Sequence, residues 1–125
     1  MRSLFRKLTE PSYALMRIAF GLLFSFHGAQ KLFGAFGGSQ ANSALMWVAG
    51  TVEFVGGLAI AVGLFTSFAS LLACGQMFIG YFWKHHPDAW FPIQNRGELA
   101  LLYAFAFLFI LCRGAGIWSV DKKNS

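Results

Sequence analysis

Four long apolar runs, separated by short polar segments, restrict what this chain of 125 residues can fold into. A helix needs about 17 to 25 mostly apolar residues to cross the hydrocarbon core of a bilayer. Runs of that kind cover approximately residues 12–36, 44–64, 67–83 and 94–112. Only 12% of the residues are charged, and a soluble core of this size could not readily bury fifteen Phe and four Trp. The sequence therefore predicts an all-α, four-transmembrane-helix bundle that forms one domain over residues 1–125.

The first apolar run has to be distinguished from a secretory signal peptide. The apolar core of a signal peptide is about 7 to 15 residues long and ends at a small-residue cleavage site. The run at residues 12–36 is longer, and no A-x-A-like site closes it. We expect it to remain on the mature protein as a membrane span.

The Lys and Arg residues are divided unequally between the two sides of the predicted bundle. Seven lie near the chain ends, and three lie on the opposite side. The two sets are Arg2, Arg6, Lys7, Arg17, Arg113, Lys122 and Lys123, against Lys31, Lys84 and Arg96. Cytoplasmic segments carry the excess of Lys and Arg, so an even number of spans predicts that both termini are cytoplasmic. Trp residues near the predicted span ends agree with this arrangement.

The net charge of +5 does not indicate nucleic-acid binding, because the basic residues form no stripe with interleaved aromatic residues. The two cysteines, Cys74 and Cys112, fall in apolar runs without a C-x-x-C pair. We expect both to be buried free thiols, and we expect no zinc site or redox dithiol. The outer segment that holds His85 and His86 is expected to be a solvated loop, because adjacent side chains point in different directions and make a poor metal site.

Every predicted span contributes a polar side chain, mostly to the outer half of the membrane. These side chains are His27, Lys31, Glu53, Gln76, Arg96 and Glu98. A charged group at the centre of a membrane helix costs about 2.5 to 3.5 kcal/mol, so such groups normally face the bundle and find partners. The least costly arrangement is a connected network. We expect Glu53 to pair with His27, and Glu98 to pair with Lys31 or Arg96.

Two interpretations of this network remain open on the residues alone. The polar contacts could simply hold the helices together, although contacts of that kind average under about 1 kcal/mol. Alternatively, a buried acid near a histidine could handle protons or bind a ligand.

These motifs resemble those of the DoxX family, small four-helix membrane proteins of bacteria and archaea. The family pattern has a first-span arginine before H-G-x-x-K, a second-span acid followed by glycines, a glutamate that opens the last span, and a Gly-rich ending with Ser-x-Asp. The matching positions are Arg17, residues 27–31, Glu53 with Gly56, Gly57 and Gly63, Glu98, residues 114–116 and residues 119–121. Ala115 stands where the family often has proline.

The resemblance implies a multi-pass protein of the bacterial or archaeal plasma membrane, associated with redox assemblies that use quinone. Our leading hypothesis is a subunit of a quinone-linked oxidoreductase complex. His27 and Glu53 would handle protons, while Lys31, Gln76, Arg96 and Glu98 would bind a quinone-like ligand. The partners would be the lipid bilayer, other membrane or redox proteins, or a second copy of the chain. The competing hypothesis is a non-catalytic membrane scaffold or assembly factor, and a third is a small transporter.

Overall fold

The computed structural model describes residues 2–38 and 40–121, and no β-strand occurs within those ranges. The all-α prediction is therefore confirmed. The α-helices are α1 (Arg2–Arg6), α2 (Thr9–Phe33), α3 (Ala44–Thr51), α4 (Gly57–Val62), α5 (Thr66–Gly80), α6 (Pro92–Asn95) and α7 (Glu98–Arg113). Two π-helical turns, η2 (Val52–Gly56) and η3 (Tyr81–His85), and two 3₁₀ turns, η1 (Ala35–Gly37) and η4 (His86–Asp88), complete the sequence of elements.

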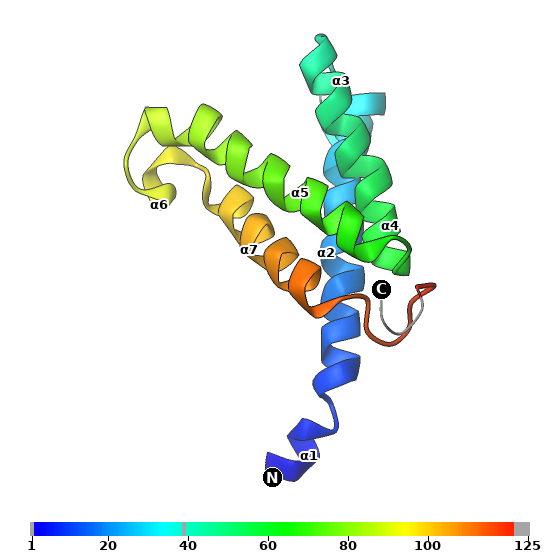
Figure 1. The fold of residues 1–125 in the computed structure, drawn as a ribbon. Helices are drawn as coiled ribbons and strands as arrows, with labels where there is room; N and C mark the ends of the chain where they lie inside the picture. The colour runs from blue at the N-terminus through cyan, green and yellow to red at the C-terminus, as the bar shows by residue number, and fades with distance from the viewer. Residues whose placement is uncertain (1, 39, 122–125) are drawn as a thin grey trace.

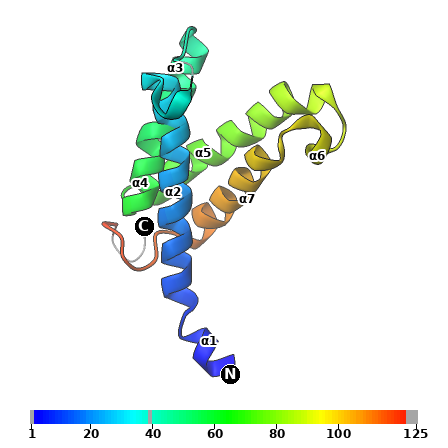
Figure 2. The ribbon, with the colours of Figure 1, turned by 180° about the vertical axis from the view of Figure 1, so that it is seen from behind.

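Two pairs of helices make up most of the molecule. In one pair, α2 lies against the continuous rod formed by α3, η2 and α4, and in the other α5 lies against α7 (Figure 1). The pairs meet near the C-terminal segment and diverge toward the end that carries α3 and α6, as the reverse view also shows (Figure 2). The molecule therefore has the shape of a V, with both described chain ends at the closed side.

One helix of the described chain, Ala44–Val62, is long and apolar enough to cross a membrane by length and composition, with 19 residues and a mean hydropathy of 1.8. It corresponds to the second predicted span. Helix α7 is shorter, with 16 residues. The other three spans and the orientation of the termini stay predictions.

Glycines bring the first pair of helices into backbone contact. A Cβ atom on Gly21 would lie 2.6 Å from the carbonyl oxygen of Gly57, and one on Gly57 would lie 2.6 Å from that of Gly21. A Cβ atom on Gly28 would lie only 2.2 Å from the backbone nitrogen of Phe54. Any side chain at these positions would push the helices apart. Small residues serve this purpose where lipid provides no hydrophobic force for helix association.

Arg17 joins the C-terminal segment to this pair of helices. Its side chain is fully buried, with 0% exposure, and it donates only to backbone carbonyls. The acceptors are Ile60 at 3.0 Å, Ala61 at 3.3 Å, Ala115 at 2.5 Å, Ile117 at 2.9 Å and Trp118 at 2.6 Å. Its position in the sequence predicts that Arg17 is one of the cytoplasmic basic residues that flank the first span. The structure instead gives it an internal structural role, because five donors in a rigid fork can satisfy several otherwise unpaired carbonyls.

The chain ending caps the start of α5. The carboxylate of Asp121 accepts hydrogen bonds from the backbone N–H groups of Phe65 and Thr66, both at 2.8 Å. These are N–H groups that a helix start leaves without an intrahelical partner. The backbone N–H of Asp121 also donates to the carbonyl of Gly63, at 2.7 Å. The Ser-x-Asp ending thus supplies a helix cap from a distant part of the sequence.

Aromatic residues fill the region where the two helix pairs meet. The ring of Phe24 on α2 lies 4.8 Å from that of Phe107 and 5.5 Å from that of Tyr103, measured between centroids, and both partners are on α7.

Cys74 belongs to the same core, as expected, but Cys112 is exposed on the surface of the chain. The expectation of two buried thiols was therefore wrong for Cys112. The apolar run around it shows no periodicity that could tell its exposed side from its packed side.

Candidate functional site

The centre of the site is Glu53, which is 2% exposed although it lies in the middle of an apolar helix. It belongs to the π-helical turn η2. Turns of this type occur mostly as single insertions in α-helices, frequently at functional sites. The close approach of Gly28 to the backbone of Phe54 holds α2 directly against this turn. The helix that carries His27 and Lys31 is thereby placed beside the carboxylate.

Glu53 is bonded to residues from two other helices. The ammonium group of Lys31 on α2 lies 2.6 Å from both carboxylate oxygens. The amide nitrogen of Gln76 on α5 donates to Oε2 at 2.8 Å, and to the carbonyl of Ala49 at 3.3 Å. The Lys31 side chain is 26% exposed, so the ion pair lies at the edge of the buried region. The buried carboxylate thus has a cation and a neutral donor as partners, and these partners differ from the predicted ones.

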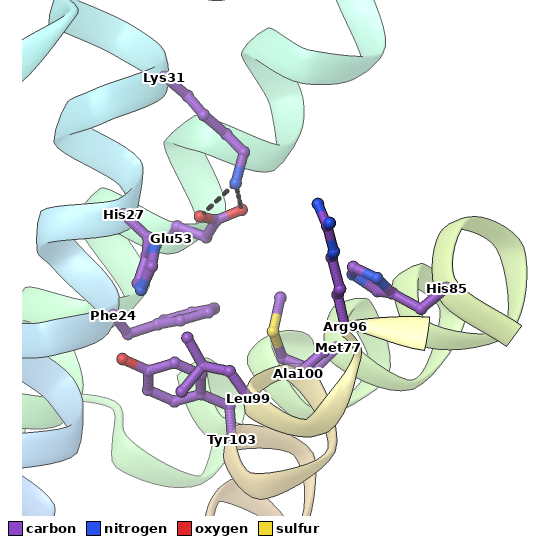
Figure 3. Close-up of a pocket in the computed structure, with 10 residues that line it drawn as sticks. All are labelled: Phe24, His27, Lys31, Glu53, Met77, His85, Arg96, Leu99, Ala100 and Tyr103. Carbon is purple, nitrogen blue, oxygen red and sulfur yellow. Dashed lines mark hydrogen bonds and ion pairs between the residues drawn. The ribbon is translucent and has the colours of Figure 1, made fainter. Parts of the chain in front are cut away.

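His27 is not the partner of Glu53, so the predicted pairing of these two residues was wrong. The His27 ring packs edge-on against Tyr103, with 5.8 Å between centroids. Side chains in an α-helix lean toward its N-terminus, so the long side chain of Lys31, one turn further along, reaches back to the level of His27 and takes the carboxylate. Figure 3 shows His27 and Glu53 side by side at the edge of one cavity.

This cavity has a volume of about 240 Å³ and lies between the two helix pairs. It is lined by Phe24, His27 and Lys31 of α2, Glu53 of η2, Met77 of α5, His85 of η3, Arg96, and Leu99, Ala100 and Tyr103 of α7. We call it the polar lobe. Phe24 and Tyr103 form its floor, while Arg96 and His85 face Glu53 and Lys31 from the opposite side (Figure 3).

A larger hollow of about 580 Å³ lies between α3 and α5, and we call it the apolar lobe. Its walls are mostly apolar residues, with Gln76 and Lys84 among them. Lys31, Glu53, Met77, His85 and Ala100 line both lobes. The two lobes together therefore form one cleft, and the Lys31–Glu53 pair stands at their junction.

Arg96 and Glu98 behave differently, although they are two residues apart. Arg96 lines the polar lobe, as predicted for a ligand-binding residue. Glu98 is exposed, lines neither lobe, and forms no ion pair within the described chain. The predicted pairing of Glu98 with Lys31 or Arg96 was wrong. Ala100 and Tyr103 are on the face of α7 that lines the cleft, and a residue two positions before Ala100 points away from that face.

The loop before α7 is fixed by a buried asparagine. Asn95 is 2% exposed, and its amide donates to the hydroxyl of Tyr81 at 3.0 Å and to the carbonyl of Ala89 at 3.1 Å. Its side-chain oxygen accepts from the backbone N–H of Gly97 at 2.8 Å. Arg96, between them, has a left-handed backbone with φ of 63°. The loop therefore presents the Arg96 side chain to the cleft from a rigid frame.

Sequence reasoning missed several residues of the cleft, above all Tyr103 and His85. Tyr103 is 4% exposed and lines the polar lobe. Its hydroxyl was a usable signal, because a tyrosine inside an apolar run normally places its polar end at a site with partners. His85 was expected in a solvated loop. It is instead half-buried, and its Nδ1 lies 3.2 Å from the carbonyl oxygen of Asn95.

Comparisons with known proteins identify the family to which the chain belongs. A family model described as DoxX matches residues 12–86, which include His27, Lys31, Glu53 and Gln76 but not Arg96 or Glu98. A protein of Haemophilus influenzae (strain ATCC 51907 / DSM 11121 / KW20 / Rd), which bears the name "Uncharacterized protein", is 36% identical over 118 residues, and the match covers 88% of each chain. No solved structure matches the chain. The resemblance in the sequence motifs is therefore confirmed, and the chain belongs to the DoxX family.

Proposed function

We propose that the chain is a four-span protein of a bacterial or archaeal plasma membrane, and that it binds a quinone-like ligand in its cleft as a subunit of a redox complex. The observation that carries the proposal is the buried Lys31–Glu53 pair at the junction of a polar lobe and an apolar lobe. A quinone has the same two parts, a polar ring and an apolar tail.

Membership of the DoxX family supports a membrane protein, and the surface of the chain is compatible with lipid. Large apolar side chains are exposed on all four of the long helical segments, including Leu22, Val55, Leu71 and Phe105. At 1.5 Å per residue, the 25 residues of α2 span about 38 Å, which exceeds the hydrocarbon thickness of about 30 Å. Extended apolar surface of this kind marks contact with a membrane or with other proteins.

The polar lobe has the groups that a quinone ring would need. Lys31 and Arg96 can donate hydrogen bonds to ring oxygens, while Phe24, Met77 and the ring of Tyr103 supply apolar walls. A bound quinone would supply the two-electron redox chemistry. Glu53 and His27 line the same lobe, which supports the proposal that they exchange protons with a ligand there.

A scaffold without catalytic function is the second candidate, and one observation favours it. The Lys31–Glu53–Gln76 group connects α2, η2 and α5, so it could serve only to hold the two helix pairs together. The same residues can serve both functions. A direct search for the ligand is therefore required.

The test is to purify the protein in a mild detergent and extract the lipid-soluble fraction for mass spectrometry. The proposal expects a quinone in a stoichiometric amount with the wild-type protein and a much smaller amount with Phe24→Leu/Tyr103→Leu, which alters the floor of the polar lobe. Absence of quinone, together with a stable protein partner that co-purifies, would favour the scaffold instead.

A further inference from the structure

The charges that line the cleft do not cancel. Three side chains are cationic, namely Lys31, Lys84 and Arg96, and one is anionic, Glu53. Three positive charges less one negative charge leave an excess of two, with the histidines counted as neutral. Glu53 already compensates Lys31, because their charged groups are 2.6 Å apart. Among the described residues, neither Arg96 nor Lys84 forms an ion pair.

The backbone at Arg96, whose exposed side chain lines the polar lobe, is fixed by the surrounding loop. Its left-handed backbone is a conformation that favours glycine, and here it is fixed by the hydrogen bonds of Asn95 on one side and by Gly97 on the other. A Cβ atom on Gly97 would lie 2.5 Å from the ring of Tyr81, so the loop has no room to shift. Unfavourable backbone conformations of this kind persist where the surroundings determine them, and they are frequent at binding sites.

The apolar lobe limits what kind of anion could enter. Its volume of about 580 Å³ lies within the range of small-molecule sites, and its walls are mostly hydrocarbon. A small inorganic anion would leave this lobe unfilled. A guanidinium at one end and an apolar lobe at the other fit a molecule with a charged head and an apolar body.

We infer that the cleft binds a small amphiphilic anion, in which one carboxylate or similarly charged head contacts Arg96 and a single apolar chain lies in the apolar lobe. The inference uses the cleft of the proposed function and deepens it, because it adds a negative charge to the ligand. Excess positive charge in a site with low-dielectric walls raises the local concentration of anions and favours them over neutral molecules of the same shape.

The test compares three probes on the purified chain in a neutral detergent. Decanoate has both the charge and the chain, acetate has the charge alone, and decanol has the chain alone. A ligand that binds the folded state raises the thermal midpoint of unfolding, which the four tryptophans report by fluorescence. We expect decanoate to raise the midpoint at concentrations at which acetate and decanol have no effect. Equal effects of decanol and decanoate would overturn the inference.

Substitutions in the loop test whether decanoate binding depends on Arg96. Arg96→Gln should weaken decanoate binding at least tenfold, while Glu98→Gln, two residues away and outside both lobes, should leave it unchanged. Arg96→Gly should raise the midpoint of the ligand-free protein, because glycine suits the left-handed backbone, and should still lose decanoate binding. An Arg96→Gly protein that binds decanoate as the wild type does would overturn the inference.

Two further arms separate the alternatives. Displacement of decanoate by phosphatidylglycerol in nanodiscs, at equal concentration, would make a bilayer lipid the occupant and overturn the single-chain ligand. Titration with decylubiquinone tests the proposed function independently. Binding of decylubiquinone without binding of decanoate would overturn only this inference, and the reverse result would overturn only the quinone.

Discussion

At the scale of single residues, the main question is whether Glu53 handles protons or only holds helices together. Its carboxylate is buried and accepts from both Lys31 and Gln76, so either function would keep an acid at this position. Glutamine has the same shape and can still form hydrogen bonds, but it cannot release or take up a proton at neutral pH.

We expect Glu53→Gln to reach the membrane in normal amount and to lose the proposed quinone-linked redox function. His27→Ala should give the same defect, and the double variant should be little worse than either single one, because residues that act as a unit are not additive. The measurement is complementation of a deletion strain, with protein amount determined in the same cells. Full activity of a normally expressed Glu53→Gln protein would exclude proton handling by this residue.

A second prediction concerns the ion pair itself. Lys31→Met removes the cation and leaves the Glu53 carboxylate with Gln76 as its remaining partner, so we expect a loss of unfolding free energy of about 3 kcal/mol. The double variant Lys31→Met/Glu53→Met should recover most of this loss, because no buried charge remains without a partner. Unfolding in a denaturing detergent, followed by tryptophan fluorescence, provides the measurement. A double variant less stable than Lys31→Met would contradict the prediction.

At the scale of the elements, contact between α2 and the α3–α4 rod depends on glycines that face the partner helix. A Cβ atom on Gly57 would lie 2.5 Å from the backbone nitrogen of Ser25, and backbone atoms cannot move aside as a flexible side chain can. The neighbouring Gly56 has no atom within 4 Å of the same position. A substitution at Gly56 is therefore a suitable control for the same substitution at Gly57.

We expect Gly57→Ala to lower the unfolding free energy by about 1 to 3 kcal/mol, as overpacking does. Gly56→Ala should be neutral or slightly stabilising, because alanine is the better helix former by up to about 1 kcal/mol. Thermal unfolding of the two variants in the same detergent measures the difference. Similar midpoints for both would show that α2 and α4 are not in backbone contact.

The start of α5 should be sensitive to acid through Asp121. Burial raises the pKa of Asp121, but the hydrogen bonds from Thr66 and Phe65 and the positive charge of Arg17 lower it more, so the pKa lies below its usual value of 3.8. A carboxylate with a lowered pKa stabilises the folded state above its unfolded pKa, and this contribution is lost as the pH falls through the folded pKa.

We therefore expect the wild type to lose stability as the pH is lowered from about 5 toward 3, and Asp121→Asn to be less stable at neutral pH but less sensitive over this window. Thermal midpoints measured across the window provide the test. The exposed Asp88, changed to Asn, is the control and should follow the wild type. Parallel curves for the wild type and Asp121→Asn would contradict the proposed cap.

The helices could be predicted from the sequence, but several contacts between them could not. Long apolar runs and terminal glycines such as Gly114 located α2, α5 and α7 to within a few residues. The choice of Lys31 over His27 as the partner of Glu53, and the burial of Arg17, depend on how helices pack against one another. Helices that are apolar on all sides carry little periodic signal about which face is packed, so these contacts have no signature in a single sequence.

At the scale of the whole molecule, the V shape and the proposed topology are connected. The N-terminal helix α1 and the segment that ends at Asp121 lie at the closed side of the V, whereas α3 and α6 lie at the open side (Figure 1). The polar residues of the cleft gather toward the open side, between the diverging pairs. A membrane orientation with both termini inside would therefore place the mouth of the cleft toward the outer surface.

The distribution of basic residues supports this orientation even after one correction. Arg17 is buried and donates to backbone carbonyls, so it cannot act as a flanking charge. The seven basic residues assigned to the inner side therefore become six, against three on the other side. The remaining excess is at the two chain ends, next to the first and last predicted spans, where it has the strongest influence on orientation.

We expect a reporter that is active only outside the cytoplasm to be silent when it is fused after residue 125, and active when it is inserted after Gln40 or after Asp88. Both insertion points are exposed and lie outside the long helices, so the insertions should leave the helix pairs intact. A cytoplasm-dependent reporter at the same three positions is the control and should give the reverse pattern. Activity of the first reporter after residue 125 would place the C-terminus outside, and would overturn the four-span arrangement together with the orientation proposed for the cleft.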